Sequence, residues 1–307
     1  MNKLAITTGD LLGIGEEITI KALNSLNLPP ENILIIGKNI NSDLKVEYET
    51  IEIDQTDNGR FCFESLKTAC NLANEGKIQG IVTAPVSKET LYKSGYKYSG
   101  QTEILQEFLG GKNSNENSKA EMIFIADDLR VLLLTRHLAL KDIKLSEDLI
   151  IDKVLRTNKF LIEKCSIQNP KFALCALNPH AGENGILGIE EKEIMTPAVL
   201  KLRSLGVNIT EPLSADGLFA NVGAKYLNKE KQAYDCILAA YHDQGLCPVK
   251  ALCFKKTVNT TIGLKVIRTS PSSGTAYDIA GKGIADATGM IEAVKLAISL
   301  TKNIRAF

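Results

Sequence analysis

Residues 4–17 read Leu-Ala-Ile-Thr-Thr-Gly-Asp-Leu-Leu-Gly-Ile-Gly-Glu-Glu, an apolar run that passes through a glycine-marked loop into a helical pattern over 16–26. Glycines between a strand and the N-terminus of a helix let backbone amides face an anion. The Gly13-x-Gly15 pair has no third glycine in register, so it does not match the dinucleotide-binding fingerprint. A tight turn that needs positive φ explains these glycines equally well. The stretch therefore predicts a strand–loop–helix unit and leaves the ligand open.

The same alternation continues along the chain and predicts an α/β fold. Short β-branched runs lie at 4–8, 33–36, 80–83, 121–125, 130–135, 172–177 and 236–241, and amphipathic helical patterns lie at 16–26, 62–75, 146–165, 191–205 and 290–302. Such alternation is typical of parallel strands joined by crossover helices. The runs around Ile123 and Leu133, separated by Asp127-Asp128, predict an antiparallel insert. The polar segment 110–118 is typical of an exposed loop.

Composition excludes several classes of protein. Of 307 residues, 44% are hydrophobic and 23% charged, and 36 basic residues balance 36 acidic ones. This balance gives no indication of a nucleic-acid or anionic membrane partner. No apolar stretch approaches the ~20 residues that cross a bilayer, and the N-terminus lacks the apolar core of a signal peptide. We expect a soluble, cytoplasmic protein of roughly two domains.

The seven cysteines are scattered and form no Cys-x-x-Cys pair. Reduced thiols that pack as small apolar groups are the expected state. Cys247 lies five residues after His242, and a structural role is expected there as well.

The three histidines, His137, His180 and His242, each follow an apolar run that is typical of a buried strand. The carboxyl ends of strands are where open α/β sheets build their sites. Three imidazoles converging there would bind a divalent metal and leave positions open for a substrate. The alternative is three unrelated, hydrogen-bonded histidines.

Other polar groups also follow strand-like runs. They are Lys88 at the end of Thr83–Lys88, the pair Gln101-Thr102 that opens a helical pattern, and the later residues Lys250, Asn259 and Arg268. Lysine, arginine and neutral donors together are the usual means of binding a phosphate or a carboxylate. A long glycine-rich loop follows at 273–286, and a loop of this length and composition usually has a ligand.

Seven of these segments together resemble one known family. They are 8–15, 83–88, 135–140, 177–183, 212–216, 241–246 and 267–270, with Thr-Arg-His at 135–137, Asn-Pro-His at 178–180 and Tyr-His-Asp at 241–243. In this order and spacing they resemble the 4-hydroxythreonine-4-phosphate dehydrogenase family of vitamin B6 biosynthesis. The loop 274–286 is similar to the cofactor loop of the isocitrate and isopropylmalate dehydrogenases.

The resemblance implies a two-lobed αβα architecture of the isocitrate/isopropylmalate dehydrogenase type, with the site in the cleft between the lobes. The expected first lobe is 1–97, with 262–307 returning to it and the cofactor loop at 273–286. The expected second lobe is 98–261, which holds the metal and substrate and forms the dimer. The resemblance also implies a homodimer whose site lies at the subunit interface.

The implied reaction is the NAD- or NADP-linked oxidation of 4-phosphohydroxy-L-threonine to a β-keto acid, which decarboxylates to 3-amino-2-oxopropyl phosphate. The implied ligands of a divalent metal (Zn, Mg or Co) are His137, His180 and His242. The small phosphorylated substrate is implied to contact Gln101, Thr102, Lys250, Asn259 and Arg268. The loop residues implied to bind the cofactor are Gly274, Thr275, Ala276, Asp278 and Asp286. Candidates for catalytic proton transfer are Asp216, Asp243 and Lys88, and the sequence does not choose among them.

The chain departs from the family pattern at the anion and cofactor contacts. Gln101 replaces a histidine, Ser272-Ser273 replaces Asp-His, and Leu11-Leu12 and Glu16 replace Pro-Ala and Pro. A glutamine donates a hydrogen bond but is never cationic. Three alternatives therefore stay open: a paralogue that oxidises another phosphorylated or carboxylated hydroxy acid, a non-redox metal enzyme such as an aldolase or acyl-phosphate transferase, and an inactive binding protein.

Overall fold

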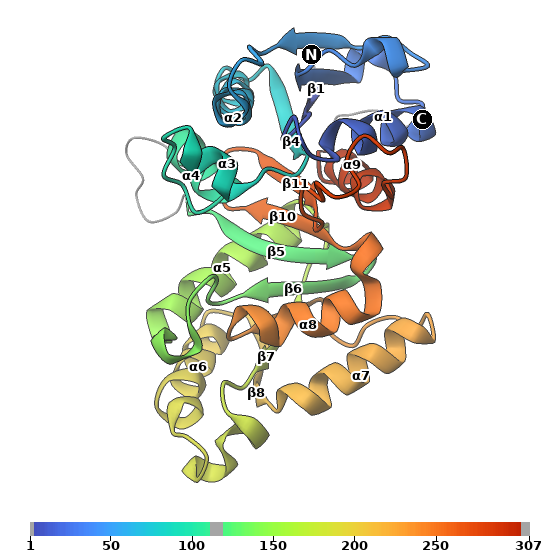
Figure 1. Ribbon diagram of the computed structural model, residues 1–307. Helices are drawn as coiled ribbons and strands as arrows, with labels where there is room; N and C mark the ends of the chain where they lie inside the picture. The colour runs from blue at the N-terminus through green and yellow to red at the C-terminus, as the bar shows by residue number, and fades with distance from the viewer. Residues whose placement is uncertain (1–2, 111–118, 302–307) are drawn as a thin grey trace. The chain divides into compact units, whose positions relative to one another are not determined.

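The computed structural model describes residues 3–110 and 119–301 and has the α/β architecture that the sequence predicts (Figure 1). The chain divides into two compact units, one of residues 1–120 with 258–307 and one of residues 121–257. None of the helices among the described residues is long and apolar enough to cross a membrane. Of the predicted loop 110–118, all but Gly110 lies outside the described residues.

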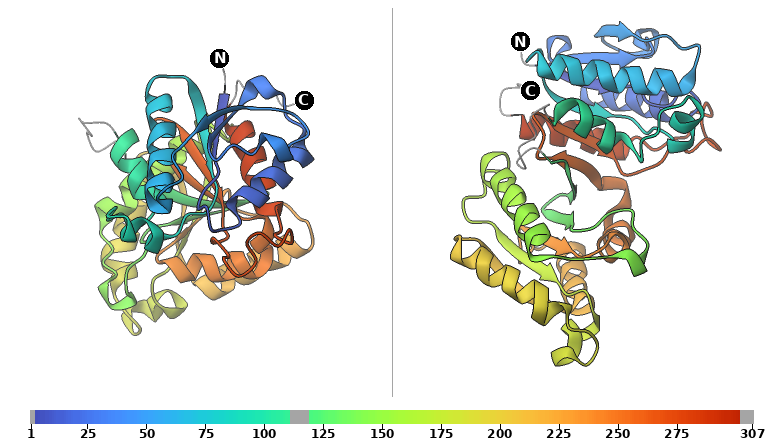
Figure 2. Two further views of the ribbon diagram at one scale, coloured as in Figure 1. Left: turned by 45° about the horizontal axis from the view of Figure 1, so that its top comes forward. Right: turned by 90° about the vertical axis from the view of Figure 1, so that its left-hand side faces the viewer.

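The first unit is a sheet with helices on both faces. Its elements are β1 (Lys3–Thr7), α1 (Gly15–Leu26), β2 (Ile33–Gly37), β3 (Glu49–Glu52), α2 (Asn58–Asn74), β4 (Ile78–Thr83), α3 (Lys88–Lys93), α4 (Gln101–Leu109), β10 (Val258–Ile262), β11 (Ile267–Pro271) and α9 (Thr288–Leu300). The strand order is β3-β2-β1-β4-β11-β10. All neighbours are parallel except β10 and β11. Helices α1 and α9 pack together on one face (Figure 2), and α2 and α4 pack on the other.

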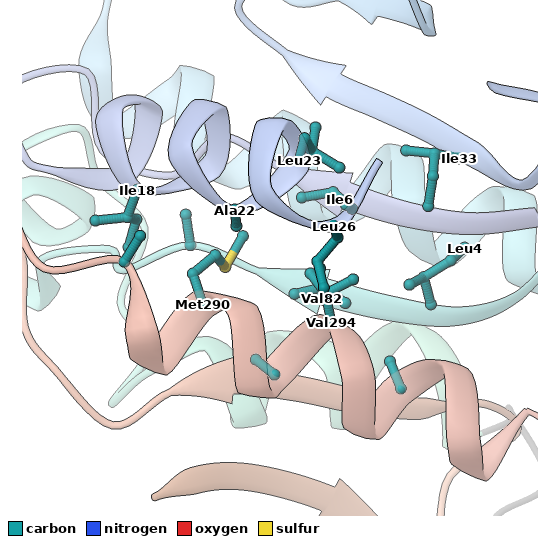
Figure 3. Packing of buried hydrophobic residues seen from close by; sticks show 14 of the residues in the cluster. Leu4, Ile6, Ile18, Ala22, Leu23, Leu26, Ile33, Val82, Met290 and Val294 are labelled. Carbon is teal, nitrogen blue, oxygen red and sulfur yellow. The ribbon is translucent and has the colours of Figure 1, made fainter. Parts of the chain in front are cut away.

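The core of this unit follows from the alternation of side chains along buried strands. Leu4 and Ile6 of β1 belong to one apolar cluster with Ile18 of α1 and Val294 of α9 (Figure 3). The intervening Ala5 belongs to the cluster on the opposite face. Because both faces are covered, these strands read as continuous apolar runs in the sequence, which is why their positions could be predicted.

The strands of the second unit follow one another in the order β5-β6-β9-β7-β8. Its elements are β5 (Glu121–Ala126), β6 (Leu129–Leu133), α5 (Glu147–Glu163), β7 (Lys171–Cys175), α6 (Thr196–Ser204), β8 (Asn208–Leu213), α7 (Ala215–Leu227), β9 (Cys236–Ala239) and α8 (His242–Cys253). The hairpin of β5 and β6 is antiparallel, as predicted, and the other neighbours are parallel. The short helices among the described residues of both units are Pro30–Asn32, Asn41–Asp43, Leu140–Asp142, Pro179–Gly185, Glu191–Met195 and Phe254–Lys256.

The unit boundaries differ from the positions that the sequence suggested. Residues 98–110 belong to the first unit because α4 places Leu105 and Leu109 in the same cluster as Ala69 of α2. Residues 258–261 belong there as well because β10 pairs with β11. The seven predicted strands are present, whereas β3, β8, β10 and β11 were not predicted.

The cysteines agree with the expected reduced, packed state. All seven are free thiols, and five of them are buried (Cys62, Cys70, Cys175, Cys236 and Cys253). Burial raises the pKa of Cys70 and of Cys175 to about 12, so these thiols are inert at neutral pH.

Candidate active site

Three adjacent parallel strands of the second unit each lead to a histidine. Strands β6, β9 and β7 are neighbours and run in the same direction. His137 follows β6, His242 is the first residue of α8 after β9, and His180 lies in the short helix after β7. Asp216 follows β8, the next parallel strand. Since the carboxyl ends of parallel strands meet at one edge, all four side chains belong to the same edge of this sheet.

The rings of His137 and His242 lie near each other. Their ring centroids lie 5.5 Å apart and the rings are tilted by 43°. Nδ1 of His242 lies 2.6 Å from Oδ1 of Asp243, which fixes the orientation of the ring and leaves its Nε2 for a ligand. Asp243 therefore lies where a carboxylate positions a metal-binding imidazole.

Gln244 ties the ends of two of these strands together. Its Oε1 accepts a hydrogen bond from the Ala240 backbone N–H at 2.6 Å, and its Nε2 donates to the Ala176 carbonyl at 2.7 Å. These two bonds fix the spacing between the ends of β9 and β7. They therefore also fix the spacing between the segments that carry His242 and His180. The sequence did not predict this role, although Gln244 lies in the same Tyr-His-Asp-Gln motif.

His180 lies in a strained segment. Residues 180–184 have left-handed backbone angles, with φ of 51° at His180 and 45° at Glu183. This conformation costs about 1–2 kcal/mol for each L-residue other than glycine. It is held by Asn178, whose amide Nδ2 donates to Glu190 at 2.7 Å and to Glu191 at 3.0 Å. Strain maintained in this way is typical of binding sites.

Asp216 is an exposed carboxylate near His180. The Ser214 hydroxyl donates a hydrogen bond to Asp216 and is the main cause of its lowered pKa, with a smaller contribution from the charge of His180. Asp216 therefore stays ionised at neutral pH.

The three histidines are suitable ligands for a divalent cation, but their side chains are not close enough together to form a complete metal site. Among residues 3–110 and 119–301, no three His, Cys, Asp or Glu side chains are grouped closely enough to hold an ion. A 5.5 Å separation of two rings is compatible with two imidazoles that share one ion at Zn–N distances of about 2.0–2.1 Å. The third ligand, His180, would have to come from the segment 179–185 by a local change or from a second copy.

A second group of predicted residues comes together in the first unit, around Arg268 of β11. Arg268 is 3% exposed. Its Nε donates to Oγ1 of Thr83 at 2.8 Å and its Nη2 to Oε1 of Gln101 at 3.1 Å. Burial lowers the pKa of Arg268 to about 10, partly opposed by the charge of Glu103, so the guanidinium is a cation at neutral pH. The hydrogen bonds described for this buried cation go to neutral groups, and a buried charge of this kind calls for an anionic partner.

Unsatisfied polar atoms lie on the same face of this sheet as Arg268. Thr261 is opposite Arg268 in the antiparallel register, and Asn259 is opposite Ser270. Oδ1 of Asn259 and Oγ1 of Thr261 are buried, and within the described part of the chain they have no hydrogen-bond partner. The same holds for Thr7, which is in register with Thr83. Buried polar atoms are rarely left unpaired, so these atoms are available to a polar ligand.

The N-terminus of α4 borders this group. Thr102 is 4% exposed, and Gln101 uses its Nε2 to donate to the Ala84 carbonyl at 3.1 Å. Backbone amides at the N-terminus of a helix favour an anion. The exposed Lys88 lies beside this end, since its Cε is 3.7 Å from the position that a Cβ on Gly100 would take. Gln101 therefore orients Arg268 in addition to any contact with a ligand, which the sequence did not predict.

Lys250, the remaining residue predicted to contact the substrate, belongs to the second unit. It is exposed on α8, and its Nζ lies 5.8 Å from the centre of the Phe254 ring. Its role in binding an anion stays a prediction.

The loop 273–286 is fixed against the loop that follows β1. Ile14 donates its backbone N–H to the Thr275 carbonyl at 2.9 Å. A Cβ on Gly13 would lie 2.9 Å from that carbonyl oxygen, so the contact requires glycine. The Tyr277 hydroxyl donates to Oδ2 of Asp10 at 2.7 Å. Of the predicted cofactor residues, Gly274 and Asp278 are exposed and Ala276 has a left-handed φ of 46°.

Asp10 and Asp286 have structural partners that the sequence did not reveal. Asp10 is 1% exposed, and its Oδ1 accepts hydrogen bonds from Nδ2 of Asn58 at 2.7 Å and from the Leu12 N–H at 3.0 Å. Oδ1 of Asp286 accepts from the backbone and hydroxyl of Thr288, at 2.9 and 2.6 Å, at the start of α9. Asp286 therefore stabilises the helix end, whatever it contributes to a cofactor.

A pocket lies between this loop and α1, with a volume of about 780 Å³. Such a volume is in the range of small-molecule sites. Oε2 of Glu17 is buried and, within the described residues, has no hydrogen-bond partner. The loop, the pocket and this free acceptor fit a nucleotide cofactor.

Comparison with known proteins now gives the family. A family model described as pyridoxal phosphate biosynthetic protein PdxA matches residues 10–297. The chain belongs to the PdxA family. It is 40% identical to a 4-hydroxythreonine-4-phosphate dehydrogenase of Sulfurihydrogenibium sp., over 98% of this chain and 99% of the relative. It is 34% identical to a D-threonate 4-phosphate dehydrogenase of Cupriavidus necator, over 97% and 96% of the two chains.

Solved structures agree with the PdxA family assignment. The 4-hydroxythreonine-4-phosphate dehydrogenase of Klebsiella pneumoniae has a TM-score of 0.81 at 30% identity, with 98% of each chain covered. An isocitrate dehydrogenase of Methylococcus capsulatus has a TM-score of 0.52 at 15% identity and covers 97% of this chain and 85% of its own. The latter shows only that the fold is shared, and it confirms the predicted isocitrate dehydrogenase-like fold class.

Proposed function

We propose that this dehydrogenase catalyses the NAD- or NADP-linked, divalent-metal-dependent oxidation of 4-phosphohydroxy-L-threonine. The product is a β-keto acid that decarboxylates to 3-amino-2-oxopropyl phosphate in vitamin B6 biosynthesis. Family membership and the name of the 40% identical relative support this substrate. The observation that best supports it in the structure is the buried Arg268 cation, whose described hydrogen bonds go to neutral groups.

The phosphate would bind at Arg268 and the N-terminus of α4. The negative charge of a phosphate ester would balance the positive charge of the buried guanidinium. The phosphate oxygens would accept hydrogen bonds from the Thr102 and Thr261 hydroxyls and from helix amides. Charge-assisted contacts of this kind are worth roughly 1.5–3 kcal/mol each. Binding the phosphate here would fix the rest of the substrate relative to the protein.

The histidines would hold the metal. When bound, a divalent cation supplies Lewis acidity at the hydroxyl that is oxidised and at the charge that develops during decarboxylation. In the protein, Asp243 holds Nδ1 of His242 and therefore suits a positioning role. The lowered pKa of Asp216 makes it a weaker base. Lys88 lies beside the start of α4, close to the proposed phosphate site, and it stays a third candidate for proton transfer.

A homodimer is part of the same proposal. Large apolar side chains are exposed next to two of the histidines: Leu138 is 56%, Leu140 69% and Ile186 79% exposed. They follow His137 and His180 in the chain. Large exposed apolar side chains are a feature of surfaces that bind another protein. A second copy that covers them could also complete the metal ligands.

The residue at position 101 favours a second candidate, a dehydrogenase of D-threonate 4-phosphate, the substrate named for the Cupriavidus necator relative. Gln101 replaces the expected histidine, so the anion site has lost a group that can be cationic. The purified chain should be assayed with both phosphorylated substrates, both cofactors and a panel of divalent metals, by following absorbance of the reduced nicotinamide. Turnover of 4-phosphohydroxy-L-threonine at the higher kcat/KM supports the proposal. Preference for D-threonate 4-phosphate supports the alternative, and no turnover of either contradicts both.

A further inference from the structure

Strands β7 and β9 are joined through a side chain at their carboxyl ends. Their backbone register reaches Leu174 and Leu238, and its continuation places Ala176 opposite Ala240. Here the Ala240 N–H donates to Oε1 of Gln244 at 2.6 Å, and Nε2 of Gln244 donates to the Ala176 carbonyl at 2.7 Å. The amide of Gln244 therefore takes the place of a direct bond between the two strands.

The other backbone groups of this pair bond to the outer strands. The Ala240 carbonyl accepts hydrogen bonds from the N–H and the hydroxyl of Thr135, at 3.2 and 2.7 Å. The Ala176 N–H donates to the Leu213 carbonyl at 2.8 Å. Because Thr135 follows β6 and Leu213 ends β8, the strand ends form two halves, β6 with β9 and β7 with β8. Gln244 lies between the two halves and connects them.

The proposed metal ligands divide in the same way. His137 and His242 follow β6 and β9, and their ring centroids lie 5.5 Å apart. His180 follows β7, and Asp216 follows β8. In the part of the chain that the structure describes, no three His, Cys, Asp or Glu side chains are close enough to hold an ion. The insertion of Gln244 accounts for this separation, since it keeps the β7–β8 half away from the β6–β9 half.

We infer that Gln244 is a positioning residue of the proposed metal site, whose side-chain amide sets the distance between the His180 segment and the His137–His242 pair. The inference rests on the proposed metal-dependent function. The spacing matters whether His180 completes the ion of its own chain or that of a second copy, because β7 places its backbone in both cases. Groups that orient the ligands of a metal typically contribute about 10–100-fold to its binding.

A spacer of this kind depends on both the length and the amide of Gln244. Methionine has a similar length but lacks the strong donor and acceptor of an amide. Asparagine has the same amide on a side chain that is one methylene shorter. It cannot keep bonds of 2.6 and 2.7 Å to the Ala240 N–H and the Ala176 carbonyl together. Replacement by each of them therefore removes one of the two properties.

The test is metal binding by the full chain, measured without turnover. The metal-free protein is titrated with Co²⁺ alone. Competition with a chelator gives the affinity, and the visible spectrum of the bound ion reports its ligand geometry. Gln244→Met and Gln244→Asn should each bind Co²⁺ at least about tenfold more weakly than the original chain and with a changed spectrum. With excess metal, kcat should fall, while KM for the phosphorylated substrate should stay nearly constant because Arg268 belongs to the first unit.

Gln232→Met is a matched control in the same unit. Gln232 is 8% exposed, and its Nε2 donates to the Val222 carbonyl at 3.4 Å. It precedes β9, whereas His242 follows that strand, so its bond lies away from the proposed metal ligands. Co²⁺ affinity and spectrum should not change in this variant. Circular dichroism would check that each variant is folded, and Gln244→Asn decides the question if Gln244→Met does not fold.

Three results would overturn the inference and leave the dehydrogenase proposal intact. They are an unchanged Co²⁺ affinity and spectrum in Gln244→Met, full affinity in Gln244→Asn, and a loss in Gln232→Met as large as that in the Gln244 variants. If the original chain bound no Co²⁺ even in the presence of the phosphorylated substrate, the proposed metal-dependent function itself would be contradicted.

Discussion

Arg268 and Gln101 are hydrogen bonded to each other, with Nη2 of the guanidinium 3.1 Å from the amide Oε1. The same amide donates to the Ala84 carbonyl at 3.1 Å, so Gln101 connects the buried arginine to the end of β4. A histidine at this position could carry charge, whereas glutamine leaves Arg268 as the fixed positive charge of the site. The choice of residue at 101 therefore affects both the orientation of Arg268 and the total charge offered to a substrate.

Replacing Arg268 should impair substrate binding. Arg268→Lys keeps a positive charge but cannot reproduce the two directed hydrogen bonds to Thr83 and Gln101, so KM for the phosphorylated substrate should rise at least about tenfold. Steady-state kinetics would measure it. Arg203→Lys is a matched control. Arg203 is partly exposed and forms an ion pair with Glu211, and both residues belong to the second unit. The KM of this variant for the phosphorylated substrate should not change. An Arg268→Lys enzyme with unchanged KM would remove Arg268 from the anion site.

Gln101→His separates the two candidate substrates. If the chain oxidises 4-phosphohydroxy-L-threonine, the added imidazole should keep or improve kcat/KM for that compound. If the chain instead acts on D-threonate 4-phosphate or a related acid, the change should lower kcat/KM for that substrate. The kcat/KM for 4-phosphohydroxy-L-threonine should then stay low. Identical kinetics of the variant and the original chain with all phosphorylated substrates would show that position 101 does not influence the anion.

Removal of one histidine should weaken metal binding. His180→Ala leaves His137 and His242, whose ring centroids are 5.5 Å apart, and two imidazoles alone bind a catalytic ion weakly. Metal content after dialysis should fall well below one ion per chain, and turnover should fall with it. A His180→Ala protein with full metal content and activity would refute the three-histidine site.

Removing the Tyr277 hydroxyl should loosen the cofactor loop. Tyr277→Phe leaves the buried Asp10 short of one donor at 2.7 Å, at a cost of about 1–3 kcal/mol in the free energy of unfolding. Denaturant unfolding would measure the stability, and the KM for the nicotinamide cofactor should rise while the KM for the phosphorylated substrate stays nearly constant. Tyr92→Phe, at an exposed tyrosine of α3, should change neither quantity. Equal effects on both KM values would argue against a loop-specific role.

The proposed dimer can be tested through its exposed apolar residues. Ile186→Asp changes a side chain that is 79% exposed, so the fold of the single chain should be unaffected, while association of two copies should weaken. Sedimentation velocity should show a dimer for the original chain and a larger monomer fraction for the variant. An original chain that is monomeric and fully active at assay concentration would exclude the dimeric site.

The sequence predicted the parts of the fold that depend on apolar patterns. The buried parallel strands and the hairpin at Ile123 and Leu133 appear where expected. Strands β10 and β11 were not predicted because their buried residues include Thr260, Thr261 and Arg268, and polar residues at buried positions give no apolar run. Thr261 and Arg268 lie on the face of the candidate anion site, whereas Thr260 lies on the opposite face of the sheet.

The sequence named candidate residues for the site but not their geometry. Histidines after strand ends could be identified, but nothing in Pro-His-Ala-Gly-Glu predicts a left-handed run from His180 to Asn184. The contact of Asp10 with Tyr277 joins residues at opposite ends of the chain, and only folding brings them together. Gln101 was expected to face a ligand, whereas its bond to Arg268 depends on the packing of α4 on the sheet.

The most direct test of the central claim is the stoichiometry of a single reaction. The purified chain, loaded with a divalent metal, is mixed with 4-phosphohydroxy-L-threonine and NAD⁺, and reduced nicotinamide and carbon dioxide are measured together, with and without a chelator. We predict equal amounts of both products with the metal and neither product after chelation. Reduced nicotinamide without carbon dioxide, undiminished turnover after chelation, or no reduction of either NAD⁺ or NADP⁺ would contradict a metal-dependent oxidative decarboxylation.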